Sequence, residues 1–160
     1  MRVFCLSTLA LFWGYLFLSL GSARRVRLVI DTDIGTYFDD TWALSYVLSR
    51  PDLFDLLLVV TCTRSTMERA QIVAKFLDSV NATNVNIGVG LPTLPHGVGP
   101  QYPWARDYNL SSYPGTVYYD DVAALTAALQ LGTPENPVYL LEIAPPVNLA
   151  TVLARNPGIE

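Results

Sequence analysis

Four of the 14 acidic residues fall within ten positions, in the run Asp31-Thr32-Asp33-Ile34-Gly35-Thr36-Tyr37-Phe38-Asp39-Asp40. Carboxylates this close repel one another, so either some are protonated or a positive group neutralises them. A helix N-terminus supplies about half a charge, no lysine is near in sequence, and Arg64 reaches the run only through the fold. A bound divalent cation is the stronger explanation. The donors are oxygens without His or Cys, which favours Ca²⁺ or Mg²⁺ over zinc.

The same acidic residues have a simpler interpretation, in which they only cap a helix and face the solvent. Asp39 suits that role on its own, because a side-chain oxygen at a helix start accepts a free backbone N–H. The whole constellation favours a cation site, since Gly35 permits a tight backbone path between the two acidic pairs.

Alternating strand and helix patterns place this acidic run. Short β-branched or leucine-rich segments predict buried strands, and apolar residues at helical spacing, such as Trp42, Ala43, Tyr46 and Val47, predict helices. Ser65 and Glu68 form a capping-box pattern that predicts a helix start. We expect strands at 26–30, 55–61, 85–89 and 137–142, and helices at 39–49, from 65 to about 77, at 119–131 and at 147–155.

Strands that alternate with helices predict parallel pairing with right-handed crossovers. The expected fold is therefore α/β, an open, doubly wound, mostly parallel sheet of the Rossmann-like kind. In such sheets ligands bind beyond the carboxyl ends of the strands. The acidic run follows the first strand directly, so it lies where a ligand is expected.

Residues 1–23 have the pattern of a secretory signal peptide. Arg2 is the positive n-region, an apolar run follows, and Gly21-Ser22-Ala23 offers a cleavage site. The alternative is an uncleaved membrane anchor, since 18 apolar residues just span a bilayer. We expect cleavage, a secreted or lumenal (extracellular or lysosome-like) protein at 24–160, and no stable membrane association after cleavage. The net charge of −4 argues against a nucleic-acid partner.

Two further features fit export. Asn81-Ala82-Thr83 and Asn109-Leu110-Ser111 are acceptor sequons for N-glycosylation, so Asn81 and Asn109 are glycosylation candidates. Cys5 lies in the leader, which leaves Cys62 without an internal disulfide partner, and its apolar setting predicts a small buried side chain.

The run from Asp31 to Leu44 resembles the N-terminal signature of the inosine-uridine-preferring nucleoside hydrolase family: a strand ending in Asp-x-Asp, a Gly, then Asp-Asp and an Ala-Leu helix. Weaker matches follow in the family's order along nearly all of the remaining chain: Val59-Val60-Thr61, Glu68-Arg69-Ala70, Ile87-Gly88-Val89-Gly90 and Asn148-Leu149-Ala150.

The resemblance implies a nucleoside hydrolase core and a Ca²⁺-dependent hydrolysis of the N-glycosidic bond of purine or pyrimidine ribonucleosides. By position, Asp33 and Asp40 would bind the metal, and Asp33 would also take a proton from the attacking water. Asp39 would bind the ribose hydroxyls, and the backbone carbonyl of Ile143 would be a further metal ligand. Nearby carboxylates would stabilise the oxocarbenium-like transition state. The implied partner is a small nucleoside, and homo-oligomerisation is left open.

The chain also departs from that pattern. It lacks counterparts of the family's later metal-binding Asp with its adjacent His and of an Asn/Glu cluster. Arg64 and Ser65 stand where an Asn or Asp is usual after the second strand, and Pro145-Pro146 replaces a Gly-Gly turn. We therefore expect a truncated N-terminal portion with an incomplete sheet. The alternative is a secreted, non-catalytic remnant that binds a cation or another ligand.

The long segment from 90 to about 115 is expected to be irregular and either functional or flexible. Its only His, His96, is a candidate substrate contact or a solvated loop residue. Four aromatic residues either stack on a base or pack the loop onto the sheet, and packing is the expectation; they are Tyr102, Trp104, Tyr108 and Tyr113.

Overall fold

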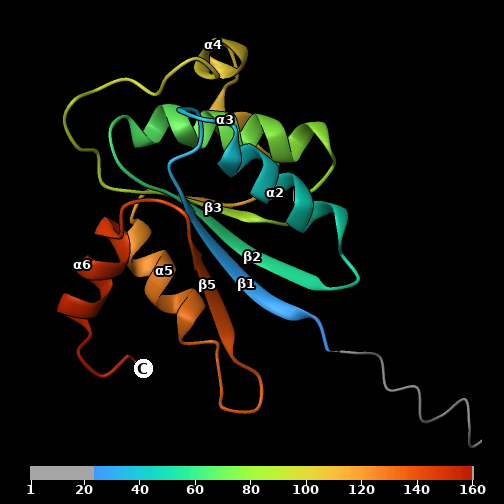
Figure 1. The fold of residues 1–160 in the computed structure, drawn as a ribbon, viewed down its shortest axis with the longest axis vertical. Coiled ribbons are helices and arrows are strands. Elements are labelled where there is room, and N and C mark those ends of the chain that lie inside the picture. Colours follow the sequence, from blue (N-terminus) through green and yellow to red (C-terminus); the bar gives the residue numbers. More distant parts are fainter. Residues whose placement is uncertain (1–23, 160) are drawn as a thin grey trace, which may run out of the picture.

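Five parallel strands form one sheet in the order β4-β3-β2-β1-β5 (Figure 1). The structure is a computed structural model and describes residues 24–159, so the expected leader at 1–23 lies outside the described residues. The strands are β1 (Val26–Thr32), β2 (Phe54–Thr61), β3 (Asn86–Val89), β4 (Val117–Tyr118) and β5 (Val138–Glu142). All four pairings are parallel, which confirms the predicted open α/β sheet.

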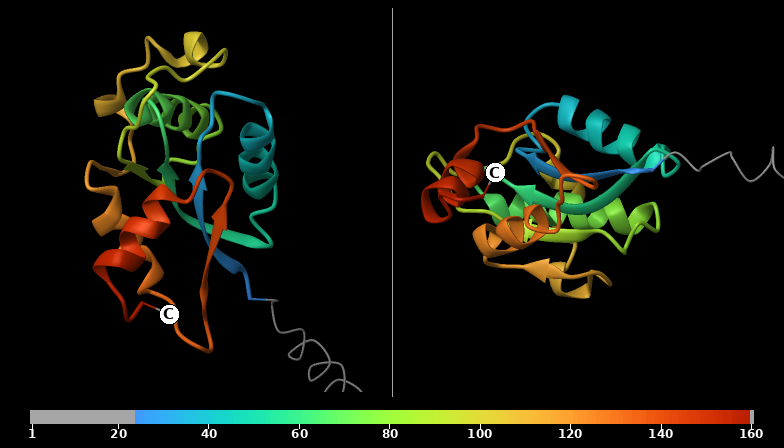
Figure 2. Two further views of the ribbon diagram at one scale, coloured as in Figure 1. Left: turned by 60° about the vertical axis from the view of Figure 1, so that its left-hand side comes forward. Right: turned by 90° about the horizontal axis from the view of Figure 1, so that it is seen from below.

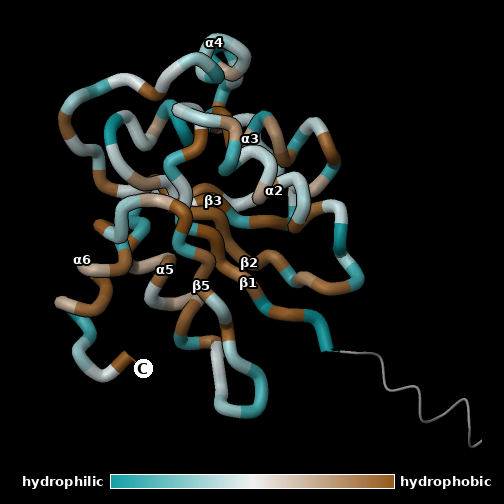
Figure 3. The backbone as a smooth tube through the Cα atoms, viewed as in Figure 1, coloured by the Kyte–Doolittle hydropathy of each residue, from teal (hydrophilic) through white to brown (hydrophobic). Residues whose placement is uncertain are grey.

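Helices cover both faces of this sheet, as the end-on view in Figure 2 shows. The helices α2 (Asp39–Ser49) and α3 (Thr66–Ser79) lie on one face, and α5 (Asp121–Leu129) and α6 (Val147–Arg155) lie on the other. Residues along β1 alternate between the two layers: Leu28 and Ile30 join the core under α2 and α3, and Val29 joins the core under α5 and α6. The strands are accordingly the most hydrophobic part of the backbone (Figure 3).

The strand order places a switch point between β1 and β5. From β1 the chain adds β2, β3 and β4 on one side, and it then returns to pair β5 with the opposite edge of β1. Asp31 is in register with Val60 on β2 and with Glu142 on β5. In open α/β sheets the crevice at such a switch point is the usual ligand site, and here it is flanked by the acidic run.

The helices begin and end close to the predicted positions, but two details differ. The inward face of α2 is formed by Asp40, Leu44 and Val47, whereas Trp42 and Tyr46 are exposed on its outer side. The capping box at Ser65 is not formed, because the Ser65 hydroxyl accepts a hydrogen bond from the Gly97 N–H at 2.9 Å instead. The helix α5 starts at an acidic pair, and Asp120 caps it by accepting the Ala123 N–H at 3.0 Å.

The segment from 90 to 115 is largely irregular, as predicted, but it contains a short helix α4 (Tyr102–Ala105) and a 3₁₀ turn (Leu110–Ser112). The aromatic residues pack it onto the molecule. The Tyr102 hydroxyl donates to Gln71 and the Tyr108 hydroxyl to Asp78, both at 3.0 Å, and the buried Tyr113 donates to the Val85 carbonyl at 2.7 Å.

Candidate functional site

The end of β1 is held on both sides by its neighbours. The Ile143 N–H donates to the Asp31 carbonyl at 3.0 Å, and the Cys62 N–H donates to the Thr32 carbonyl at 2.8 Å. The chain then leaves the sheet at Asp33 and turns at Gly35, whose φ is +112°. A side chain there would be strained and would also collide with Val98. The glycine therefore allows the tight path to α2 that the sequence predicted.

Asp40 is the most firmly held of the predicted ligands. It is 5% exposed in the first turn of α2, and its Oδ1 accepts a hydrogen bond from Thr32 Oγ1 at 2.6 Å. Burial raises its pKa; the Thr32 hydrogen bond opposes this, and the charges of Asp33 and Asp39 add to it. A cation beside Asp40 would favour the ionised form that burial disfavours.

Asp33 and Asp39 border the same turn but are more accessible. The Asp33 side chain is 30% exposed, and Asp39 is exposed at the first position of α2. Both are near enough to Asp40 to raise its pKa through their charges. The fold thus gathers three predicted site residues at the carboxyl edge of β1.

Ile143 brings a main-chain oxygen to this edge. Its N–H is taken by Asp31, whereas no residue between 24 and 159 donates a hydrogen bond to its carbonyl oxygen. Asp33 and Asp40 lie just beyond the end of β1, and this free carbonyl follows the end of the adjacent strand β5. Ca²⁺ takes about six to eight oxygen ligands, water and ligand hydroxyls among them. The donor chemistry of the residues present therefore fits calcium and would fill part of its coordination shell.

Arg69 was not foreseen as part of this site. It lies in the first turn of α3 with no exposed surface, and its guanidinium donates to the carbonyls of Asp33, Ile34 and Thr63 and to Thr36 Oγ1. Its Nη2 is 3.9 Å from Asp33 Oδ2. From the sequence, Arg64 was the positive side chain expected to approach the acidic run. The signal that could have found Arg69 is its place within the apolar stripe of α3.

A second polar cluster lies on the opposite face of the sheet. Asp31 points towards the α5 and α6 layer and is fully buried, and its Oδ1 accepts from Asn148 Nδ2 at 3.0 Å. Among the described residues its Oδ2 has no hydrogen-bond partner, and neither do the carboxylate oxygens of Glu142. Burial and then the charge of Glu142 raise the pKa of Asp31 to about 8. Burial and the charge of Asp31 likewise raise the pKa of the Cys62 thiol to about 12.

The loop after β2 is used to hold the irregular segment. The Arg64 N–H donates to Thr93 Oγ1 at 2.8 Å, and the Arg64 carbonyl accepts from the Thr93 N–H at 3.1 Å. Ser65 binds Gly97, as described above. Beside them a cavity of about 630 Å³ opens beyond the end of β3. Its lining includes the exposed His96 together with Met67, Tyr102 and Tyr119.

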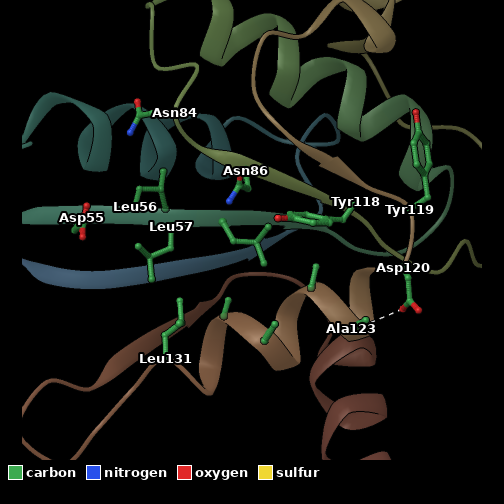
Figure 4. A pocket seen from close by; sticks show the side chains of 14 residues that line it. Asp55, Leu56, Leu57, Asn84, Asn86, Tyr118, Tyr119, Asp120, Ala123 and Leu131 are labelled. Carbon is green, nitrogen blue, oxygen red and sulfur yellow. Dashed lines mark hydrogen bonds between the residues drawn. The ribbon is translucent and has the colours of Figure 1, made fainter.

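A separate groove of about 590 Å³ runs between α5 and strands β2 to β4 (Figure 4). Its walls are the alanines of α5 and the leucines of β2, with Asn86 and Tyr118 on the sheet side. None of Asp33, Asp39 and Asp40 lines it. The predicted chemistry therefore lies at the carboxyl edge and not in this groove.

No family model and no curated protein matches this chain. Among residues 24–159, no three side chains of His, Cys, Asp or Glu gather into a metal-binding group. The calcium ligands expected from the sequence include only two carboxylates, with a main-chain oxygen as the third donor. Calcium binding therefore stays a prediction. Over the same residues, no helix combines the length and the apolar composition needed to cross a bilayer.

Proposed function

We propose that this chain forms the N-terminal, cation-binding part of a Ca²⁺-dependent hydrolase that cleaves the N-glycosidic bond of ribonucleosides. The observation that carries the proposal is the position of the neighbouring carboxylates Asp33 and Asp40 just beyond the carboxyl end of β1, the strand beside the switch point of the parallel sheet. The resemblance of the run from Asp31 to Asp40 to the nucleoside hydrolase signature supplies the reaction.

Each residue has a distinct task in this proposal. Asp40, which is fixed by Thr32, would hold the cation together with Asp33 and the Ile143 carbonyl. When bound, calcium supplies a Lewis acid that lowers the pKa of a water molecule. Asp33, which is partly exposed, would accept the proton of the attacking water. Asp39 would accept hydrogen bonds from the ribose hydroxyls, and the carboxylates would stabilise the positive charge that develops on the sugar.

The test is ribose release from inosine and from uridine by the full-length gene product, in calcium and in a chelator. We expect release that requires calcium, that is lost in Asp33→Asn and that is kept in the control Asp107→Asn, whose side chain is 87% exposed. Release that is absent from the folded protein, or that is unaffected by the chelator, would contradict the proposal.

A second candidate function is a secreted, non-catalytic module that binds a cation or a nucleoside without turnover. The observation that favours it is the loop after β2, where Arg64 and Ser65 replace the Asn or Asp usual in the family and the Ser65 hydroxyl is taken by the Gly97 N–H. Binding of inosine measured by calorimetry, without ribose release over the same period, would select this alternative.

A further inference from the structure

A buried positive charge lies beside the oxygen donors of the candidate site. The Arg69 guanidinium makes four hydrogen bonds, and three of them go to main-chain carbonyls: Thr63 at 3.1 Å, Ile34 at 2.6 Å, and Asp33. These acceptors belong to the loops that leave β1 and β2. Carbonyls carry no net charge, so the bonds hold the guanidinium in place but leave its charge uncompensated.

Carboxylates provide the compensation only at a distance. Asp33 Oδ2 is 3.9 Å from Arg69 Nη2, which is beyond hydrogen-bonding range. The negative charge of Asp40 also acts on Arg69. The two carboxylates assigned to the cation therefore already face a fixed positive charge, and that charge is shielded from water because Arg69 has no exposed surface. Charges in such a setting interact more strongly than they do at a solvated surface.

We propose that Arg69 is a built-in counter-charge that sets how tightly the Asp33 and Asp40 site holds a divalent cation. The proposal rests on the proposed function, because it concerns the same site. A dication and a fixed guanidinium repel each other and compete for the field of Asp33. The same guanidinium stabilises the acidic turn when no cation is bound. We therefore expect weak calcium affinity, in the range of about 10⁻⁴ to 10⁻³ M that extracellular calcium modules show.

The test is a calorimetric titration with CaCl₂ of the wild-type chain and of Arg69→Gln and Arg69→Lys, after circular dichroism has verified folding in chelator. Gln removes the charge but keeps an amide donor for the loop carbonyls, and Lys keeps the charge without the planar fork. We expect Arg69→Gln to bind calcium at least about tenfold more tightly than wild type. Arg69→Lys and the exposed control Arg106→Gln should bind like wild type.

The outcomes separate this inference from the proposed function. If wild type shows no binding and Arg69→Gln does, calcium use by the wild-type protein fails while the role of Arg69 stands. If a folded Arg69→Gln binds no more tightly than wild type, or not at all up to about 10 mM calcium, the inference is overturned. Equal tightening in Arg69→Lys also overturns it. Should Arg69→Gln fail to fold, Arg69→citrulline is the neutral replacement of nearly identical shape, with the same expected tightening.

Discussion

Single residues explain why the acidic run divides into two groups. Asp33, Asp39 and Asp40 border the carboxyl edge, whereas Asp31 lies on the other face of the sheet against Asn148. Within β1, Asp31 and its neighbour Thr32 point to opposite faces, and it is Thr32 that binds Asp40. Asp33 lies beyond the end of the strand, and Asp39 and Asp40 belong to α2. The four carboxylates therefore do not form one site, and the fully buried Asp31 is a protonated acid at neutral pH, since its pKa is about 8.

This raised pKa predicts a pH dependence of stability. The folded state holds the Asp31 proton from the ordinary value of 3.8 up to about 8, whereas the unfolded state releases it near 3.8. The free energy of unfolding should therefore fall as the pH rises through this window and level off above it. Asp31→Asn should flatten that slope. The free energy of unfolding of the variant minus that of wild type should therefore be larger at pH 8 than at pH 4.

The measurement is urea unfolding from pH 4 to 9 in chelator, with Asp107→Asn as the control that keeps the wild-type slope. Asn keeps an oxygen for the Asn148 amide, so the 3.0 Å hydrogen bond survives the substitution. An equal slope in wild type and Asp31→Asn would show that Asp31 ionises normally in the fold.

The predictable part of the site is the part that is local in sequence. The spacing of Asp33, Asp39 and Asp40 around Gly35 is visible in ten residues, and so is their place after a strand. Arg69 was missed because its side chain meets Asp33 only across the gap between α3 and β1, a contact that sequence spacing does not record. The free carbonyl of Ile143 depends likewise on how β5 pairs with β1.

At the level of elements, periodicity was a good guide to helices and long strands. The bounds of α2 and α6 agree with the prediction, and those of β1, β2 and β5 agree within two residues. The strand β4 was missed because two residues carry no periodic signal. The cap at Ser65 was wrong because the loop at Gly97 offered the hydroxyl a different partner.

The ends of β2 and β3 approach so closely at Gly90 that we expect a side chain there to destabilise the protein. A Cβ at Gly90 would collide with the Thr61 carbonyl oxygen and press on the side-chain amide of Asn148, 3.0 Å away. Both neighbours belong to the network that holds Asp31, so neither gives way easily. We expect Gly90→Ala to cost about 3 kcal/mol of stability or more.

Chemical denaturation measures this cost, and Gly158→Ala is the matched control, because a Cβ at Gly158 meets nothing within 4 Å. A Gly90→Ala protein as stable as the control would contradict the close approach of Gly90 to the Thr61 carbonyl.

At the scale of the whole molecule, the two glycosylation candidates lie close together and far from the candidate site. Asn81 is exposed between the end of α3 and the start of β3, which is the amino edge of the sheet. Asn109 is also exposed, and its neighbour Tyr108 binds Asp78 in the same helix end. Glycans on both would leave the carboxyl edge uncovered.

Secretion of the chain from eukaryotic cells tests this arrangement. We expect two gel-mobility steps that peptide N-glycosidase removes, with one step lost in Asn81→Gln or in Thr83→Ala and the other lost in Asn109→Gln or in Ser111→Ala. A secreted protein whose mobility is unchanged by the glycosidase would rule out both sites.

The carboxyl edge of the sheet carries oxygen donors at the end of β1, in the first turn of α2 and after β5, and we propose that together they bind calcium. The most direct test is a calorimetric titration of the folded chain with calcium, comparing wild type, Asp40→Asn and the exposed control Asp107→Asn. We predict saturable binding by wild type and by the control, and its loss in Asp40→Asn. Calcium binding of equal strength by Asp40→Asn, or no binding by the wild-type chain, would contradict the account.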